Sequence, residues 1–373
     1  MACLLEKFLP ISHSFTLSRS HFFPAAPRVP CFRCFPNPAN MSTEKPKTNR
    51  NFCSVTSKAN GEDPIGSAGT YDHWFIFEIA PPWSEEFWRE QPMLQSMLAV
   101  ASEQIEQGNL RMRPLAIAPD REYSQEVPRN YVRLLYYYRP ARLFAHFDKR
   151  EYILPTEEVS ALAIALLTDS QQLPQFESCR RDTSHIREIL VCTHGNVDVA
   201  CSRFGYPIYR KLRLEHAAAS QGQLRVWQCS HFGGHRFAPT LIDLPEGRYW
   251  GHLEPEMLDL LIWREGTVTE LRRFYRGWAG LTQIEQIAER EMWMQQGWQW
   301  LDYLKVGRTL AMDENEQKWA DIEVEFSTPD RSAGGIYESR IEVSNWVETM
   351  GESDNQKLTN LRQYRVNHLV RVD

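Results

Sequence analysis

Apolar and polar residues follow two different periods along this chain, and together they predict a mixed α/β fold. Short apolar runs such as HWFIFEIA (73–80) and LRVWQC (224–229) have the length of buried strands. In other stretches apolar residues recur every three or four positions. One of these, residues 84–107, is expected to be a helix capped by Ser84 and followed by Gly108. Strands and helices should therefore alternate, as in a sheet covered by helices.

The same patterns assign the other elements of the first two thirds of the chain. Further strands are expected at 110–118, 131–138, 187–192, 238–244 and 247–253, the last two forming a hairpin. Further helices are expected from Thr156 to Leu167, from the loop after Cys192 to His216 with a break near Gly205–Pro207, and from Pro255 onward. A thioredoxin-like mixed sheet flanked by helices fits this order.

The pattern changes after about residue 266. Thr282 and Glu285 have the spacing of a capping box that opens a helix, and the Met/Trp stripe that follows is typical of a core face. Three runs with strand-like alternation come next, the first from Ile322 to Phe326. The pattern after residue 266 therefore predicts a helical connector followed by a small β-rich module.

Three segments result from these assignments: a poorly ordered tail at 1–60, the thioredoxin-like domain at 61–265 and the C-terminal helical and β module at 266–373. Residues 1–40 are rich in proline and poor in acids, which is typical either of an organellar transit peptide or of sequence upstream of a true start at Met41. We favour Met41. Cys31 and Cys34 form a C-x-x-C that lacks a preceding strand, so we interpret it as incidental.

Composition and charge exclude some classes of function. The net charge of -6 argues against a general nucleic-acid binder, and no apolar run reaches the length of a membrane span. We expect a cytoplasmic protein that binds neither nucleic acid nor membrane, with a plastid or another organelle as the alternative if 1–40 is a transit peptide. The basic cluster RRFYR (272–276) is interpreted as the solvated face of a helix.

Two cysteines and two histidines form a candidate metal site. Cys192 is expected at the end of a strand and Cys201 on the helical turn that follows. His231 and His235 flank Gly233 and Gly234 in a loop after a neighbouring strand. A Gly-Gly pair is a poor helix interior but suits a loop whose backbone approaches another group closely. All four side chains should therefore meet at one edge of the sheet.

The spacing of these residues leaves the metal open. Four such ligands suit tetrahedral zinc or an iron–sulfur cluster. Structural zinc sites usually hold paired cysteines two to four residues apart, whereas Cys192 and Cys201 are nine apart. A wider separation suits a [2Fe-2S] cluster, in which two cysteines bind one iron and two histidines the other, as in Rieske centres.

Several neighbours of these four residues are candidates for supporting roles. His194 is a candidate for shielding or lining the metal, and Gly233 and Gly234 for bringing backbone N–H groups close to it. Arg236 would place positive charge near the site or lie on the surface. Cys229 is a spare thiol that we assign to packing. Asp198 is read as a loop or cap residue, and Cys53 and Cys179 have no evident partner.

Two stretches resemble a known family. CTHGNVDVACSRFG and SHFGGHRFAPTLIDLPEGRYWGHL are similar to segments of sucrase/ferredoxin-like proteins, and the likeness extends to CSVTSKANGEDPIGSAGTYDHW upstream and FYRGWAGL downstream. It covers most of 53–373 and leaves out the first 40 residues. The resemblance implies a thioredoxin-like protein that carries a [2Fe-2S] cluster, with Cys192, Cys201, His231 and His235 as its ligands.

The leading functional hypothesis is therefore an electron-transfer or redox-sensing protein that works with an unidentified redox partner protein. The alternative is a structural or regulatory zinc-binding module that uses the same four residues. A sucrose-cleaving hydrolase is a weaker reading, because it needs two paired carboxylates and no spacing among the 48 acidic residues singles out a pair. Whether the protein is an enzyme stays open.

Overall fold

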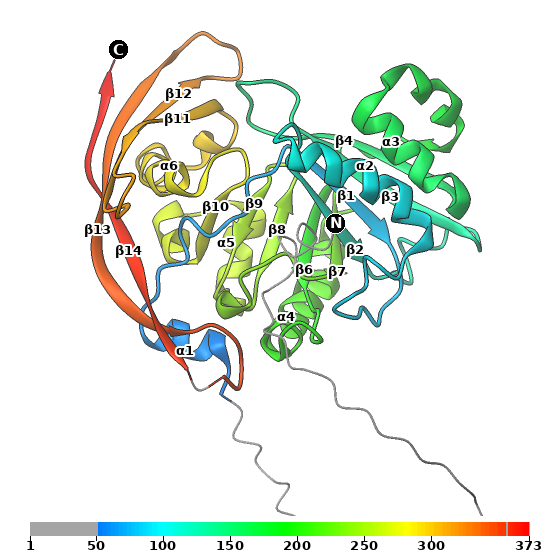
Figure 1. Ribbon diagram of the computed structural model, residues 1–373, viewed down its shortest axis with the longest axis horizontal. Helices are drawn as coiled ribbons and strands as arrows, with labels where there is room; N and C mark the ends of the chain where they lie inside the picture. The colour runs from blue at the N-terminus through cyan, green and yellow to red at the C-terminus, as the bar shows by residue number, and fades with distance from the viewer. Residues whose placement is uncertain (1–50, 356, 373) are drawn as a thin grey trace, which may run out of the picture. The chain divides into compact units, whose positions relative to one another are not determined.

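The computed structural model describes residues 51–355 and 357–372 (Figure 1). The predictions for Cys31, Cys34 and Met41 lie outside these residues. Helix α1 (Cys53–Ala59) falls within the segment 1–60 that the sequence assigns to a tail, and Cys53 at its start is completely buried.

A ten-stranded mixed sheet forms the larger part of the structure. Its strands follow the order β10-β9-β8-β6-β7-β2-β1-β3-β4-β5. Their bounds are β1 (His73–Glu78), β2 (Met112–Ile117), β3 (Tyr131–Tyr138), β4 (Asp148–Pro155), β5 (Arg180–Arg181), β6 (Arg187–Cys192), β7 (Leu224–Cys229), β8 (Leu241–Leu244), β9 (Arg248–Trp250) and β10 (Tyr275–Trp278). The expected mixed sheet is thus confirmed, while its thioredoxin-like character stays a prediction.

The two halves of this sheet share one pairing pattern. In the first half β1 is parallel to β2 and antiparallel to β3, which is antiparallel to β4. In the second half β6 is parallel to β7 and antiparallel to β8, which is antiparallel to β9. The halves meet where β2 pairs with β7, through Ile117 and Cys229. The candidate ligands lie in the second half.

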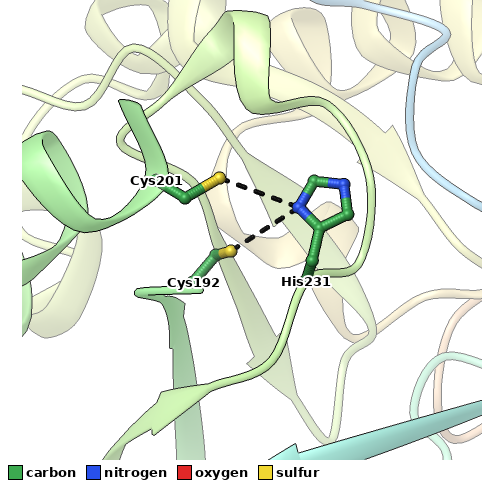
Figure 2. A group of neighbouring side chains, drawn as sticks. All are labelled: Cys192, Cys201 and His231. Carbon is green, nitrogen blue, oxygen red and sulfur yellow. Dashed lines mark hydrogen bonds between the residues drawn. The ribbon is translucent and has the colours of Figure 1, made fainter. Parts of the chain in front are cut away.

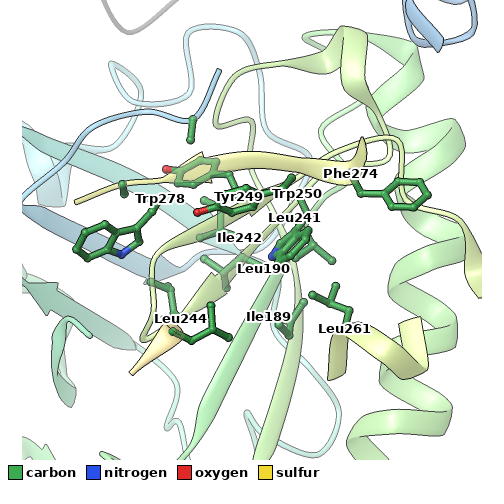
Figure 3. Close-up of a cluster of buried hydrophobic side chains, with 14 of the residues drawn as sticks. Ile189, Leu190, Leu241, Ile242, Leu244, Tyr249, Trp250, Leu261, Phe274 and Trp278 are labelled. Carbon is green, nitrogen blue, oxygen red and sulfur yellow. The ribbon is translucent and has the colours of Figure 1, made fainter. Parts of the chain in front are cut away.

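Helices cover the sheet on its faces (Figure 1). Their bounds are α2 (Gln95–Glu106), α3 (Val159–Thr168), α4 (Val199–Lys211), α5 (Leu258–Trp263) and α6 (Gln283–Gln296). Figure 3 shows the core of the second half, where apolar side chains of β6, β8 and β9 meet Leu261 of α5 and Trp278 of β10. Burial of this apolar surface gives a rigid frame for the loops at the ends of β6 and β7.

The small β-rich module expected at the C-terminus is a four-stranded antiparallel sheet. Its strands are β11 (Leu304–Met312), β12 (Trp319–Ser327), β13 (Gly334–Met350) and β14 (Leu358–Val372). This sheet curves around α6 (Figure 1). Thr282 and Glu285 form the predicted capping box at the start of α6, and the Thr282 N–H donates to Glu285 Oε2 at 2.9 Å.

Two helix predictions were wrong in their details. The helix expected from residue 84 begins as α2 only at Gln95, because Pro92 disfavours helical backbone at Gln91, which is extended. The break expected near 205–207 is absent, since α4 runs through both positions. Gly205 serves close packing instead: a Cβ there would lie 2.1 Å from the carbonyl oxygen of Cys192.

The reading of the cluster 272–276 as a solvated helix face was wrong for Arg276. Arg272 and Arg273 lie exposed on a short 3₁₀ segment (Val268–Phe274), as expected. Arg276 instead belongs to β10, at the edge of the large sheet, and is only 2% exposed. The strand β10 has only four residues, YRGW, which is too short to show a strand-like alternation in the sequence.

The sequence places a boundary between domain and module at residue 265. β10 lies beyond it and pairs with β9, and the division itself stays a prediction. Across residues 51–355 and 357–372, no helix has both the length and the apolar character needed to span a bilayer.

Candidate metal centre

Two parallel strands bring the first three candidate ligands together. Cys192 is the last residue of β6, and its partner in the register is Cys229, the last residue of β7. His231 follows β7 by two residues, and Cys201 lies in the first turn of α4, which follows β6. Because parallel strands end at the same edge of a sheet, these side chains meet there.

The three ligand atoms are close enough to share one metal site. His231 Nδ1 lies 3.8 Å from Cys192 Sγ and 3.7 Å from Cys201 Sγ (Figure 2). Together they form a group whose ligand atoms lie within 4.8 Å of one another. Each cysteine is 1% exposed. The predicted convergence of Cys192, Cys201 and His231 is therefore present.

The pKa values of the two thiols are shifted in opposite directions. Burial by itself raises the pKa of Cys192, but hydrogen bonds from Cys201 and His231 outweigh burial, and its pKa lies well below the ordinary value. The neighbouring Cys192 and burial together raise the pKa of Cys201 well above the ordinary value. The pair therefore favours one thiolate and one thiol. A thiolate is the form that binds a metal.

The fourth candidate, His235, lies beside a second group of ligand atoms. Its ring centroid is 5.5 Å from that of His231. Its Nδ1 lies 3.2 Å from Asp198 Oδ2 and 3.5 Å from Cys53 Sγ, and these three side chains form another group with ligand atoms within 4.8 Å of one another. The Nε2 atom of His235 has no hydrogen-bond partner within 51–355 and 357–372.

Asp198 and His235 stabilise each other as an ion pair. Burial tends to raise the pKa of the Asp198 carboxyl, but hydrogen bonds from His235 and Ser353 dominate and hold that pKa well below its usual range. Burial tends to lower the pKa of His235, but the hydrogen bond to Asp198 raises it to about 9. Asp198 is also the N-cap of α4, as expected, since its Oδ1 accepts from the Ala200 N–H at 2.8 Å.

The loop that carries His231 is fixed from both sides. The His231 N–H donates to His194 Nδ1 at 3.2 Å, and His194 Nε2 donates to the carbonyl oxygen of Trp83 at 2.8 Å. Arg113 Nη2 donates to the carbonyl oxygen of His231 at 2.8 Å. His194 therefore supports the backbone of a candidate ligand.

Gly233 and Gly234 turn the chain between the two histidines with φ angles of 94° and 80°, where a side chain is disfavoured. The space beside Gly233 is open, whereas a Cβ on Gly234 would lie 2.3 Å from the guanidinium of Arg276. That guanidinium donates to the carbonyl oxygens of Gly233 at 3.0 Å and Ser67 at 2.7 Å. Burial lowers the pKa of Arg276 to about 10, which still leaves it charged at neutral pH.

Two further candidates lie away from the ligand atoms. Arg236 donates to Glu62 Oε1 at 2.7 Å, so its charge is neutralised by that carboxylate. Cys229 is completely buried in the hydrophobic core and belongs to neither group of candidate metal ligands. Cys229 thus packs, as expected, and Arg276 and Arg113 place buried positive charge on the loop of His231.

Sequence reasoning missed Cys53 and Arg276. Cys53 lies more than 140 positions from every residue it contacts near the site, so no local spacing could pair it. Arg276 was hidden in a cluster of similar residues. A signal was available for Arg276, because a basic residue flanked by Tyr275, Gly277 and Trp278 is unusual for a solvated helix.

The donor set fits a metal of intermediate softness. Two thiols and two imidazoles bind zinc, and they also bind a [2Fe-2S] cluster of mixed ligation.

Comparisons with known proteins agree with the quoted motifs. The family described as Suc_Fer-like, sucrase/ferredoxin-like, matches residues 64–277, a stretch that contains Cys192, Cys201, His231, His235 and Arg276. Neither the comparison with curated proteins nor that with solved structures gave a match. Since the matched stretch is more than half of the chain, the chain belongs to the sucrase/ferredoxin-like family.

Proposed function

We propose that this chain binds a [2Fe-2S] cluster through Cys192, Cys201, His231 and His235, and that it carries or senses electrons together with a redox partner protein. The observation that supports this most is the convergence of two buried thiols and His231 at one strand edge, with the His235 ring beside them. Such a cluster would supply one-electron chemistry.

The side chains of this site suit that role. The Cys192–Cys201 pair favours a thiolate before any metal arrives. His231 presents Nδ1 to the thiols. For His235 the free atom is Nε2, because Nδ1 is engaged by Asp198. A metal-bound histidine whose other nitrogen donates to a carboxylate is the usual arrangement in metal sites.

A mononuclear zinc site is a second candidate. The close grouping of Cys192, Cys201 and His231 offers three protein ligands, the His235 ring lies beside them, and zinc takes this combination of sulfur and nitrogen donors. Zinc binding would leave the protein colourless and free of sulfide.

The test is to purify the protein anaerobically from cells supplied with iron. We expect about two irons and two acid-labile sulfides per chain, with the absorption of an iron–sulfur protein. Cys192→Ala should abolish the cluster. Cys229→Ala is the matched control, since this thiol is equally buried and pairs with Cys192 in the sheet register. Stoichiometric zinc without sulfide would refute the proposal.

A further inference from the structure

We propose that Ser353, in the turn between β13 and β14, is a positioning residue for the metal centre that orients His235 by holding Asp198. This inference rests on the proposed function and adds a role for the C-terminal sheet. Ser353 lies outside the stretch 64–277 that matches the family. We call Ser353 with its two hydrogen bonds to Asp198 the clasp.

The clasp engages both oxygens of the carboxylate. The Ser353 N–H donates to Asp198 Oδ2 at 2.8 Å, and Ser353 Oγ donates to Asp198 Oδ1 at 2.7 Å. The Ala200 N–H donates to Oδ1 as well. Three donors from two separate elements therefore fix the plane of this carboxylate, whose side chain is only 3% exposed.

The fixed carboxylate determines how the imidazole is presented. His235 Nδ1 lies 3.2 Å from Asp198 Oδ2, so Nδ1 keeps its proton for the carboxylate and Nε2 is the nitrogen that would give up its proton to bind a metal. A carboxylate behind a ligating histidine fixes the tautomer and makes the other nitrogen a stronger donor to metal. Loss of the clasp would let Asp198 rotate and would weaken both effects.

The clasp also joins the first residues of the described chain to the turn between β13 and β14. The Cys53 N–H donates to Ser353 Oγ at 3.2 Å, and the Asp354 N–H donates to the carbonyl oxygen of Asn51 at 2.8 Å. In Figure 1 the turn between β13 and β14 lies against α1. Helix α1 thus holds the turn in place, and the turn holds Asp198.

The trio of Cys53, Asp198 and His235 has the residue types of a nucleophilic triad but not its geometry. In such a triad the acid and the nucleophile contact opposite nitrogens of the histidine. Here Cys53 Sγ and Asp198 Oδ2 both lie beside Nδ1. The arrangement therefore supports ligation through Nε2 and does not activate the Cys53 thiol.

The test compares Ser353→Ala and Ser353→Thr with the wild type, and uses Ser344→Ala, a substitution at an exposed position of β13, as the control. Three properties are measured on anaerobically purified protein: the nitrogen couplings of the two imidazoles by pulsed electron paramagnetic resonance, the reduction potential, and the rate of iron loss to a chelator. Asp198→Asn, which keeps the capping oxygen, is measured alongside them.

We expect Ser353→Ala to keep iron and sulfide but to change one of the two nitrogen couplings and shift the potential. Iron loss should be about 10-fold faster in Asp198→Asn, and faster to a smaller degree in Ser353→Ala. Ser353→Thr, which keeps the hydroxyl, should restore the wild-type values. Wild-type couplings, potential and loss rate in Ser353→Ala would overturn the clasp alone. A wild-type protein without iron and sulfide would overturn the proposed function, and the clasp with it.

Discussion

The guanidinium of Arg276 donates a hydrogen bond to the carbonyl oxygen of Gly233 at 3.0 Å, and so ties an edge strand to the loop between His231 and His235. Arg276 and Arg113, which donates to the carbonyl oxygen of His231, are both buried cations that hydrogen-bond to the backbone of this loop. The other donors of Arg276 go to Ser67, through Nε to Oγ at 3.0 Å and Nη2 to the carbonyl oxygen. Arg276 therefore helps to hold the loop, together with His194 and Arg113, and adds positive charge near the two thiols.

Replacing Arg276 should make the centre harder to reduce. A positive charge favours the reduced state, so Arg276→Met should lower the reduction potential by roughly tens of millivolts, as expected for one buried charge at moderate effective dielectric. Arg276→Lys should keep most of the potential, because the charge remains. Protein-film voltammetry measures both.

Arg273→Met is the matched control for Arg276, because Arg273 is close in sequence but its side chain is 67% exposed. Its potential should equal that of the wild type. An unchanged potential in Arg276→Met, with the cluster still present, would show that this cation does not act on the centre.

Gly234→Ala should destabilise the loop more than a left-handed glycine elsewhere would. Gly222 has a similar φ of 84° but open space beside it, so Gly222→Ala reports backbone strain alone, about 1–2 kcal/mol. At Gly234 the new Cβ must also displace Arg276. Urea unfolding should therefore give a larger loss of unfolding free energy for Gly234→Ala. In the background Arg276→Met the two alanine variants should lose similar amounts, and a persistent difference would contradict this account.

Converting His231 and His235 to cysteine should retain a cluster but lower its potential. Thiolates place more negative charge on iron than neutral imidazoles do, so the fall should be on the order of 100 mV or more. The wild-type potential should also decrease with rising pH, by up to about 59 mV per unit, because a ligating imidazole can lose its second proton. Voltammetry across pH on both proteins should show this slope only in the wild type. Equal potentials and slopes would mean that these histidines do not bind iron.

The buried His252 predicts a loss of stability in mild acid. Burial, together with nearby cations of which Lys58 comes first, lowers the pKa of His252 from 6.5 to about 4. The unfolded chain therefore binds one more proton than the folded chain between these values. Stability should be complete above pH 6.5 and should fall as the pH drops, by up to about 3 kcal/mol from this residue near pH 4.

His252→Asn isolates that contribution, since asparagine tolerates the φ of 52° found there. Unfolding free energies measured from pH 7.5 to pH 5 should decline less in the variant than in the wild type. Parallel declines in the two proteins would show that His252 is not the group responsible.

Much of the fold could be predicted because its signals are local. The strands β6 and β7 are short, largely apolar runs. The capping box of α6 is recognisable from Thr282 and Glu285, which lie within four residues of each other. The convergence of Cys192, Cys201 and His231 followed from one further rule, that parallel strands end together.

What could not be predicted depends on contacts between distant segments. Gly205 looks like a helix breaker until the packing of α4 on the end of β6 is known. From the sequence alone Arg276 is interpreted as a surface charge, and only the pairing of β10 with β9 shows that it belongs to the sheet. The support of His235 comes from Cys53 and Ser353, which are 300 positions apart, and no pattern within a short window carries that information.

The turn between β13 and β14 also sets an order of events during synthesis. Asp198 leaves the ribosome 155 residues before Ser353, the residue that engages both of its oxygens. Residues up to Cys229 can form their strands earlier, since domains begin to fold as they emerge. A growing chain can therefore gather its thiols while His235 still lacks its final orientation. Correct metal loading should follow translation of Ser353, so a ribosome stalled before this codon would expose an incompletely supported site.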